Sequence, residues 1–273
     1  MMKYYTSFRP GHHDFDYAKR AVQAGLTGFE AVYWESYLTS EVYQEYLKCV
    51  KRIKGELGAG FTVHGPITDI HLGSLNRKMR EAAFEEIRGS LRFARAIGAS
   101  LVVFHPAPGI LAMPGGEGSK QDYHLPRKTG DLIRQEEYLV RAVKDLADYA
   151  PDLLIGLENL VFPHELYRSP VELRELIRKV NRSNVGITLD VGHATVCGQK
   201  PMDFLNLLAD EVFHVHLHDN HGAVDEHLPL GEGVIDYVAV VQSLKRLDYQ
   251  GVVNLEFSVE NPDGYSDYLY QFR

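Results

Sequence analysis

The chain has 273 residues, of which 45% are hydrophobic and 24% charged, so it can bury a sizeable core within the size range of one barrel domain. Acidic residues outnumber basic residues by 37 to 29, and the net charge of -8 disfavours a polyanion such as nucleic acid as a partner. The start lacks the apolar core of a signal peptide, and no apolar run approaches the length of a membrane span. We therefore expect a cytoplasmic protein without a membrane partner.

Apolar runs of strand length alternate with longer stretches of helical periodicity along the whole chain. Eight strands are expected, at Lys3–Ser7, Gly28–Tyr33, Gly60–His64, Ser100–His105, Leu153–Glu158, Asn184–Asp190, Val212–His218 and Val252–Phe257. Helices are expected at Phe15–Ala24, Ser40–Glu56, Arg77–Ile97, Leu132–Tyr149, Pro170–Val180, Pro201–Leu208 and Ile235–Leu247, with a short one near the C-terminus. Buried parallel strands joined by helices predict a single (β/α)8 TIM barrel domain over residues 1–273.

Polar side chains occur at or near the ends of six of these strands. They are His64, His105, Glu158, Asp190, His216 and Glu256. In a barrel, the carboxyl ends of the strands meet at one mouth, where such enzymes place their chemistry. A helix cap or a loop hydrogen bond explains any single one of these residues, but it explains six of them poorly.

The stretch 186–233 is the richest in imidazole and carboxylate groups, which suit zinc, manganese or iron. In Asp190-Val-Gly-His193 we expect Gly192 to let the backbone turn sharply, so that both donors reach neighbouring ions. The spacing of Asp225 and His227 predicts that they lie on one side of an extended loop.

Three histidines, His214, His216 and His218, alternate along one predicted strand and share one of its faces. Their spacing alone does not say which of them binds a metal. Cys49 and Cys197 are too few for a disulfide framework and are interpreted as reduced thiols.

Seven short motifs together resemble the xylose-isomerase-like barrel superfamily, which contains sugar phosphate isomerases/epimerases and endonuclease IV. They are Val-His64-Gly-Pro, Val-Phe-His105-Pro, Leu-Glu158-Asn, Leu-Asp190-Val-Gly-His193-Ala, His216-Leu-His218-Asp219-Asn, Asp225-Glu-His227 and Leu-Glu256-Phe. The resemblance runs from about His64 to Glu256, in the usual chain order of that superfamily.

The resemblance implies up to three divalent ions, with zinc favoured and manganese, iron or cobalt as alternatives. A central ion would be held by Glu158, Asp190, His216 and Glu256. A second would take His64 and His105 and share Glu158, and a third would take His193, Asp225 and His227. All nine positions match the three-zinc endonuclease IV pattern, whereas many epimerases keep only the central four. The match selects His216, which leaves His218 to support a ligand or contact the substrate, and His214 deeper in the barrel.

Other candidate substrate contacts rest on weaker signals. Trp34 follows the second strand, where it could stack on a sugar ring or close the barrel end. The segment 107–130 is long and glycine-rich, and we interpret it as either a lid that brings Lys120 and Arg127 to a substrate phosphate or a solvated loop. His12 and His13 could reach the mouth, although helix capping and exposure explain them as well.

Two functions are compatible with this site. The first is a metal-dependent isomerase or epimerase of a small sugar or sugar phosphate, acting through an enediolate, with Glu158 and Glu256 as paired base and acid. The second is an endonuclease IV-like phosphodiesterase or phosphatase, acting on a small phosphoester or abasic DNA. The acidic balance favours a small-molecule substrate, and therefore the first function. A homo-oligomer, formed through tyrosines near the C-terminus, remains an alternative to packing of those tyrosines on the barrel wall.

Overall fold

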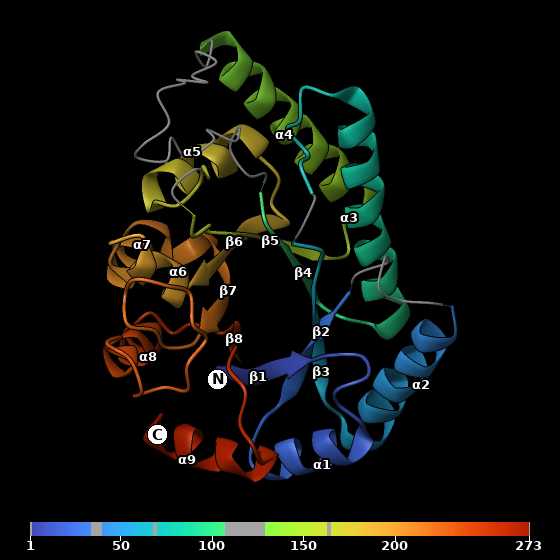
Figure 1. The fold of residues 1–273 in the computed structure, drawn as a ribbon, viewed down its shortest axis with the longest axis vertical. Coiled ribbons are helices and arrows are strands. Elements are labelled where there is room, and N and C mark those ends of the chain that lie inside the picture. The colour runs from blue at the N-terminus through green and yellow to red at the C-terminus, as the bar shows by residue number, and fades with distance from the viewer. Residues whose placement is uncertain (1, 34–39, 68–69, 107–128, 163–164, 273) are drawn as a thin grey trace, which may run out of the picture.

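The structure is a computed structural model that describes residues 2–33, 40–67, 70–106, 129–162 and 165–272. Its eight strands form a closed parallel barrel in which each strand pairs with the next and β8 pairs with β1 (Figure 1). The strands are β1 (Lys3–Phe8), β2 (Gly28–Val32), β3 (Gly60–His64), β4 (Leu101–Phe104), β5 (Leu154–Glu158), β6 (Val185–Asp190), β7 (Val212–Leu217) and β8 (Val252–Leu255). The predicted TIM barrel is confirmed, and every predicted strand is present.

Helices lie outside the strands, as the alternating pattern predicted (Figure 1). They are α1 (Phe15–Gln23), α2 (Ser40–Leu57), α3 (Arg77–Ile97), α4 (Thr129–Tyr149), α5 (Pro170–Val180), α6 (Val191–Val196), α7 (Pro201–Leu208), α8 (Tyr237–Arg246) and α9 (Tyr265–Gln271), with 3₁₀ turns η2 (Ala209–Glu211) and η3 (Pro262–Gly264). Helix α6 was not predicted, because six residues are too short for a helical period to be recognised. Among the described helices, none is both long and apolar enough to cross a bilayer.

Local sequence signals set several helix ends. Asn76 caps the start of α3 through its side chain, and Gly98 ends that helix in the left-handed conformation, which glycine adopts without strain. Ser169 and Glu172 form a capping box at the start of α5, where Pro170 occupies the first turn. These signals fix where α3 begins and ends and where α5 begins.

Alternation along the strands separates an outer apolar layer from a polar interior. On β3, Phe61 and Val63 are buried in the apolar core, whereas Thr62 and His64 belong to the opposite face. On β2, the interior face carries Glu30, which is fully buried. Toward the carboxyl ends of the strands, the barrel interior is therefore built from hydrogen-bonding side chains.

At the end of the barrel away from His64 and Glu158, the ring of Tyr5 is buried beside two glycines. A Cβ atom added at Gly28 would lie 2.5 Å from the ring of Tyr5, and one added at Gly60 would lie 2.0 Å from its hydroxyl oxygen. Glycine is therefore required at both positions, because the Tyr5 side chain fills the space that other side chains would occupy.

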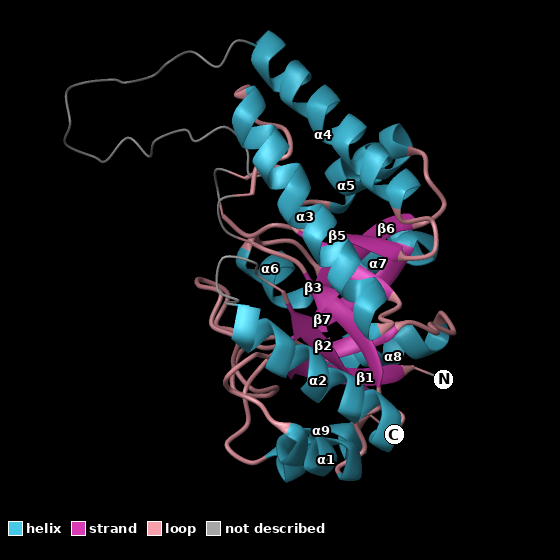
Figure 2. Ribbon diagram, turned by 90° about the vertical axis from the view of Figure 1, so that its right-hand side faces the viewer, coloured by secondary structure: helices cyan, strands magenta, loops and turns pink. Residues whose placement is uncertain are grey.

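The C-terminal tyrosines pack as expected on the barrel wall, with one exception. Helix α9 lies beside α1 in both views (Figure 2). Tyr265 is 1% exposed, and its hydroxyl lies 2.7 Å from Thr6 Oγ1 and 3.2 Å from the Tyr17 hydroxyl. Tyr268 packs edge-on against the ring of Phe257, whereas Tyr270 is 73% exposed.

We predict that Tyr265→Phe lowers the free energy of unfolding by about 1–2 kcal/mol, because it removes the buried hydrogen bonds that the hydroxyl makes with Thr6 and Tyr17. Urea denaturation followed by far-UV circular dichroism measures the change. Tyr270→Phe, at an exposed position of the same helix, is the matched control and should change stability by less than about 0.5 kcal/mol. Equal effects of the two substitutions would contradict the role assigned to the buried hydroxyl.

Candidate metal centre

Four of the predicted ligands meet around one imidazole nitrogen at the mouth of the barrel. His216 Nδ1, on β7, lies 2.9 Å from Glu256 Oε2, 3.3 Å from Glu158 Oε1 and 3.7 Å from Asp190 Oδ2. His216 and Asp190 are 0% exposed, and Glu158 is 1% exposed. The three carboxylates come from β5, β6 and the end of β8, so the closed barrel is what brings them together.

A second group of donors shares Glu158 with the first. Nε2 of His64 and Nε2 of His105 each lie 3.3 Å from Glu158 Oε2. The other carboxylate oxygen, Oε1, faces His216. Glu158 therefore has one oxygen in each group, as a carboxylate that bridges two ions requires.

The third group joins helix α6, which follows β6, to the loop after β7. Asp225 Oδ2 lies 3.2 Å from His193 Nε2 and 3.0 Å from His227 Nε2. The predicted proximity of Asp225 and His227 is confirmed, but the predicted extended backbone is not. His227 has a φ of +52°, and this left-handed conformation turns its ring toward Asp225.

Backbone carbonyls fix which nitrogen of three histidines is available to an ion. Nδ1 of His64 lies 2.8 Å from the Gly65 carbonyl, Nδ1 of His193 lies 2.8 Å from that of Asn159, and Nδ1 of His227 lies 2.9 Å from that of Glu256. A carbonyl oxygen only accepts hydrogen bonds, so each Nδ1 must carry a hydrogen atom and donate a hydrogen bond. The Nε2 atoms of the three histidines, which face carboxylates, are thus the nitrogens whose lone pairs can bind a metal ion.

In the part of the chain that the structure describes, three carboxylate oxygens of these groups are buried and accept no hydrogen bond. They are Glu158 Oε2, Asp225 Oδ1 and Glu256 Oε2. A buried carboxylate oxygen without a partner is strongly unfavourable unless a cation satisfies it. Imidazole nitrogens and carboxylate oxygens in this mixture suit a first-row divalent ion, so these residues fit the implied metal.

Charge pairing within the centre shifts the pKa values of its members. Burial opposes protonation of His64, but the neighbouring Glu158 raises its pKa to about 9. Burial likewise opposes protonation of His227, whereas Asp225 raises its pKa to about 9. Burial favours the neutral form of Glu158, yet His216 and His105 hold the pKa of that carboxyl well below its usual range. A metal ion would have to displace the imidazole protons, so its affinity should rise with pH.

Asp190 and Gly192 show how helix α6 shapes the centre. Asp190 Oδ1 accepts a hydrogen bond from the His193 backbone at 2.6 Å, so this ligand also caps α6. Gly192 does not supply the sharp turn that we expected, because its φ is not positive. A Cβ at this position would lie 1.9 Å from the ring of His218, so the glycine makes room for that ring.

His218 contacts two of the proposed metal ligands directly. Its Nε2 lies 3.2 Å from both carboxylate oxygens of Asp190, and its ring stacks on that of His227 with centroids 4.0 Å apart. The side chain is 0% exposed. Of the two roles predicted for His218, the geometry favours support of a ligand, and contact with the substrate stays a prediction.

Two cavities of about 500 and 410 Å³ open beside the centre. Both are lined by Ser7, Arg9, His12, His227 and Glu256. The sequence reasoning considered His12 but missed Ser7 and Arg9, which follow the first strand without a motif. Their position at the carboxyl end of β1 was the available signal.

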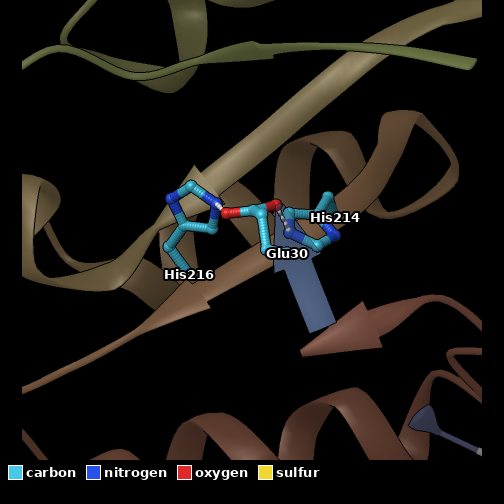
Figure 3. Close-up of side chains that lie close together, drawn as sticks. All are labelled: Glu30, His214 and His216. Atoms are coloured by element: carbon cyan, nitrogen blue, oxygen red, sulfur yellow. Dashed lines mark ion pairs between the residues drawn. The ribbon is translucent and has the colours of Figure 1, made fainter. Parts of the chain in front are cut away.

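The sequence reasoning also missed Glu30 on β2. Its carboxylate lies between His214 and His216, deeper in the barrel than the proposed ligands (Figure 3). An acid in the middle of a short apolar strand was the signal that could have identified it. The predicted substrate contacts Trp34, Lys120 and Arg127 lie outside the described residues.

Fold and site together define a TIM barrel with a buried centre of histidine and carboxylate donors at its mouth. Residues 18–269 match the family described as xylose isomerase-like TIM barrel, and the chain belongs to this family. The resemblance carried by the sequence motifs is thereby confirmed.

The chain is also similar to individual proteins and to a solved structure. An uncharacterised protein of Methanocaldococcus jannaschii is 29% identical and aligns with 77% of this chain and 68% of its own length. An L-ribulose 3-epimerase of Methylomonas is 28% identical over 45% of this chain and 43% of its own length. The crystal structure of a D-tagatose 3-epimerase-like protein superposes with a TM-score of 0.79 at 24% identity, covering 99% of this chain and 97% of that one.

We predict that Gly192→Ala weakens metal binding about tenfold, because the added methyl group displaces the His218 ring from Asp190. Zn²⁺ affinity, measured by competition with a chromophoric chelator, tests this. Gly198→Ala, at a position with nothing within 4 Å of the new Cβ, is a control for the general effect of an added methyl group near α6. Its φ of +67° makes it the more strained substitution, so a larger loss of affinity in Gly192→Ala cannot come from backbone strain.

Proposed function

We propose that the protein is a metal-dependent isomerase or epimerase acting on a small sugar or sugar phosphate. One observation carries the proposal: a single nitrogen, His216 Nδ1, faces carboxylates from three different strands at the open mouth of the barrel. The similarity in sequence to an L-ribulose 3-epimerase, and in fold to a D-tagatose 3-epimerase-like protein, supports this reaction class. The adjoining cavities, of about 500 and 410 Å³, suit a small substrate.

The chemistry divides between the ion and the protein. A divalent ion bound by these donors supplies Lewis acidity toward the hydroxyl and carbonyl oxygens of the substrate. Glu158 and Glu256 are the proposed base and acid, which remove the proton next to the carbonyl and return it. They approach His216 Nδ1 from the separate strands β5 and β8, which is compatible with access to opposite faces of one carbon atom.

The two outer groups of donors favour a second candidate function, a phosphoesterase of small substrates. His64 and His105 surround one oxygen of Glu158, and His193 and His227 surround one oxygen of Asp225. A cluster of ions suits phosphoryl chemistry, because one activates the nucleophile while others stabilise the leaving oxygen. We rank it second, because the similar proteins cited above include an L-ribulose 3-epimerase and a D-tagatose 3-epimerase-like protein.

If the two outer groups bind metal as well as the central four ligands, protein purified without chelator will carry about three ions per chain, and His227→Ala will lose about one of them. Elemental analysis by mass spectrometry measures both. His221→Ala, an exposed histidine in the same loop that pairs with Glu226, is the matched control and should retain the full content. A single ion, unaffected by either substitution, would restrict the site to the central four ligands.

We predict that Glu256→Gln reduces epimerisation by at least about 100-fold, because it removes one of the two groups proposed to transfer the proton. Ketoses and ketose phosphates incubated in D₂O report the reaction by proton NMR, since a proton removed and returned is replaced by deuterium. Glu232→Gln neutralises an exposed carboxylate outside the ligand set and is the control. Release of inorganic phosphate without deuterium exchange, lost in Glu256→Gln, would replace the epimerase by the phosphoesterase.

A further inference from the structure

His216 differs from three other histidines of the centre in how its second nitrogen is held. His64, His193 and His227 each donate Nδ1–H to a backbone carbonyl and present Nε2 to the centre. His216 presents Nδ1 instead, and its Nε2 lies 3.0 Å from Glu30 Oε1 (Figure 3). A side-chain carboxylate thus stands where the other rings have a carbonyl oxygen.

Glu30 is held in this position from three other sides. Thr62 Oγ1 donates to Glu30 Oε2 at 3.0 Å, and Asn254 Nδ2 donates to Oε1 at 3.0 Å. His214 Nε2 lies 2.9 Å from Oε2. Each carboxylate oxygen therefore has one hydrogen bond and one imidazole nitrogen beside it. Such surroundings favour the ionised carboxylate, although Glu30 is fully buried.

The cluster of Glu30, His214 and His216 is not well suited to hold an ion of its own. Its donor atoms lie close enough for one ion. Both oxygens of Glu30 already accept hydrogen bonds, from Thr62 and Asn254, and all three members of the cluster are 0% exposed. An ion would have to break these bonds in a place without access from solvent. Support of the ligand above it is the simpler role.

We propose that Glu30 is a positioning residue that keeps the proton of His216 on Nε2 and thereby directs the Nδ1 lone pair at the central metal ion. The proposal rests on the metal centre of the proposed function but not on its sugar chemistry. The Nε2 contact has the distance but not the alignment of a full hydrogen bond. The negative charge 3.0 Å away nevertheless favours the proton at Nε2, because electrostatic attraction depends weakly on alignment.

The charge of Glu30 also makes His216 a stronger ligand. A carboxylate beside the far nitrogen of a metal-binding imidazole raises the basicity of the near nitrogen and fixes the orientation of the ring. A bound cation would in turn compensate the buried charge of Glu30 through the ring. Glu30 and the ion should therefore stabilise each other, although the His216 ring separates them.

The test compares Glu30→Gln with Thr62→Val in the full chain. Glu30→Gln keeps the size of the side chain but removes its charge. Thr62→Val removes a hydrogen bond to the same carboxylate but leaves the His216 contact in place. We expect Glu30→Gln to weaken Zn²⁺ binding by about 10- to 100-fold, measured by chelator competition, and Thr62→Val to weaken it by less than about threefold. Urea denaturation with chelator present checks that both variants fold.

Two binding results would overturn the proposal: Zn²⁺ affinity of Glu30→Gln within threefold of the wild type, or equal losses in the two variants. A second measurement does not depend on any variant folding. Nitrogen-15 NMR of the histidine rings in the Zn²⁺-loaded wild type should place the His216 proton on Nε2, and a proton on Nδ1 would refute the assignment. Both readouts report metal binding, so a failure to find a sugar substrate would leave them unaffected.

Discussion

The closed parallel sheet is the constraint on which the rest of this structure depends. Eight strands that run in one direction bring their carboxyl ends to one mouth, and the residues that end them must share that space. Here those residues are histidines and acids, many of them fully buried. Buried charge is tolerable only when it is paired or bound to a cation, so the fold itself requires the polar cluster to be organised.

In four of the histidines, this organisation gives both ring nitrogens a defined neighbour. Backbone carbonyls next to β3, β5 and β8 hold one nitrogen of His64, His193 and His227, and Glu30 faces the equivalent nitrogen of His216. Inside the barrel, Thr62 and Asn254 donate hydrogen bonds to Glu30 in turn. The centre is thus part of the barrel core rather than an addition to its surface.

Some features of the site were predictable because they depend on order along the chain. The strand-end positions of His64, Glu158 and Asp190 follow from the alternation of apolar runs, and the motifs around them select the ligand set. Other features depend on contacts between residues far apart in sequence. Gly192 was assigned to a turn, but it is required by the His218 ring, which follows the next strand. The left-handed backbone of His227 likewise has no signature in its spacing from Asp225.

The sequence by itself determined the barrel, the family and the residue types gathered at its mouth, because the periodicity of burial and the motifs are properties of neighbouring residues. Only the tertiary structure decided which nitrogen of each histidine faces the centre and which carboxylate oxygen each group shares. It also decided that Glu30, an acid on an otherwise apolar strand, lies beneath His216. These relations arise from strand register and barrel closure, which bring together residues far apart in sequence, such as Glu30 and Asn254, 224 positions apart.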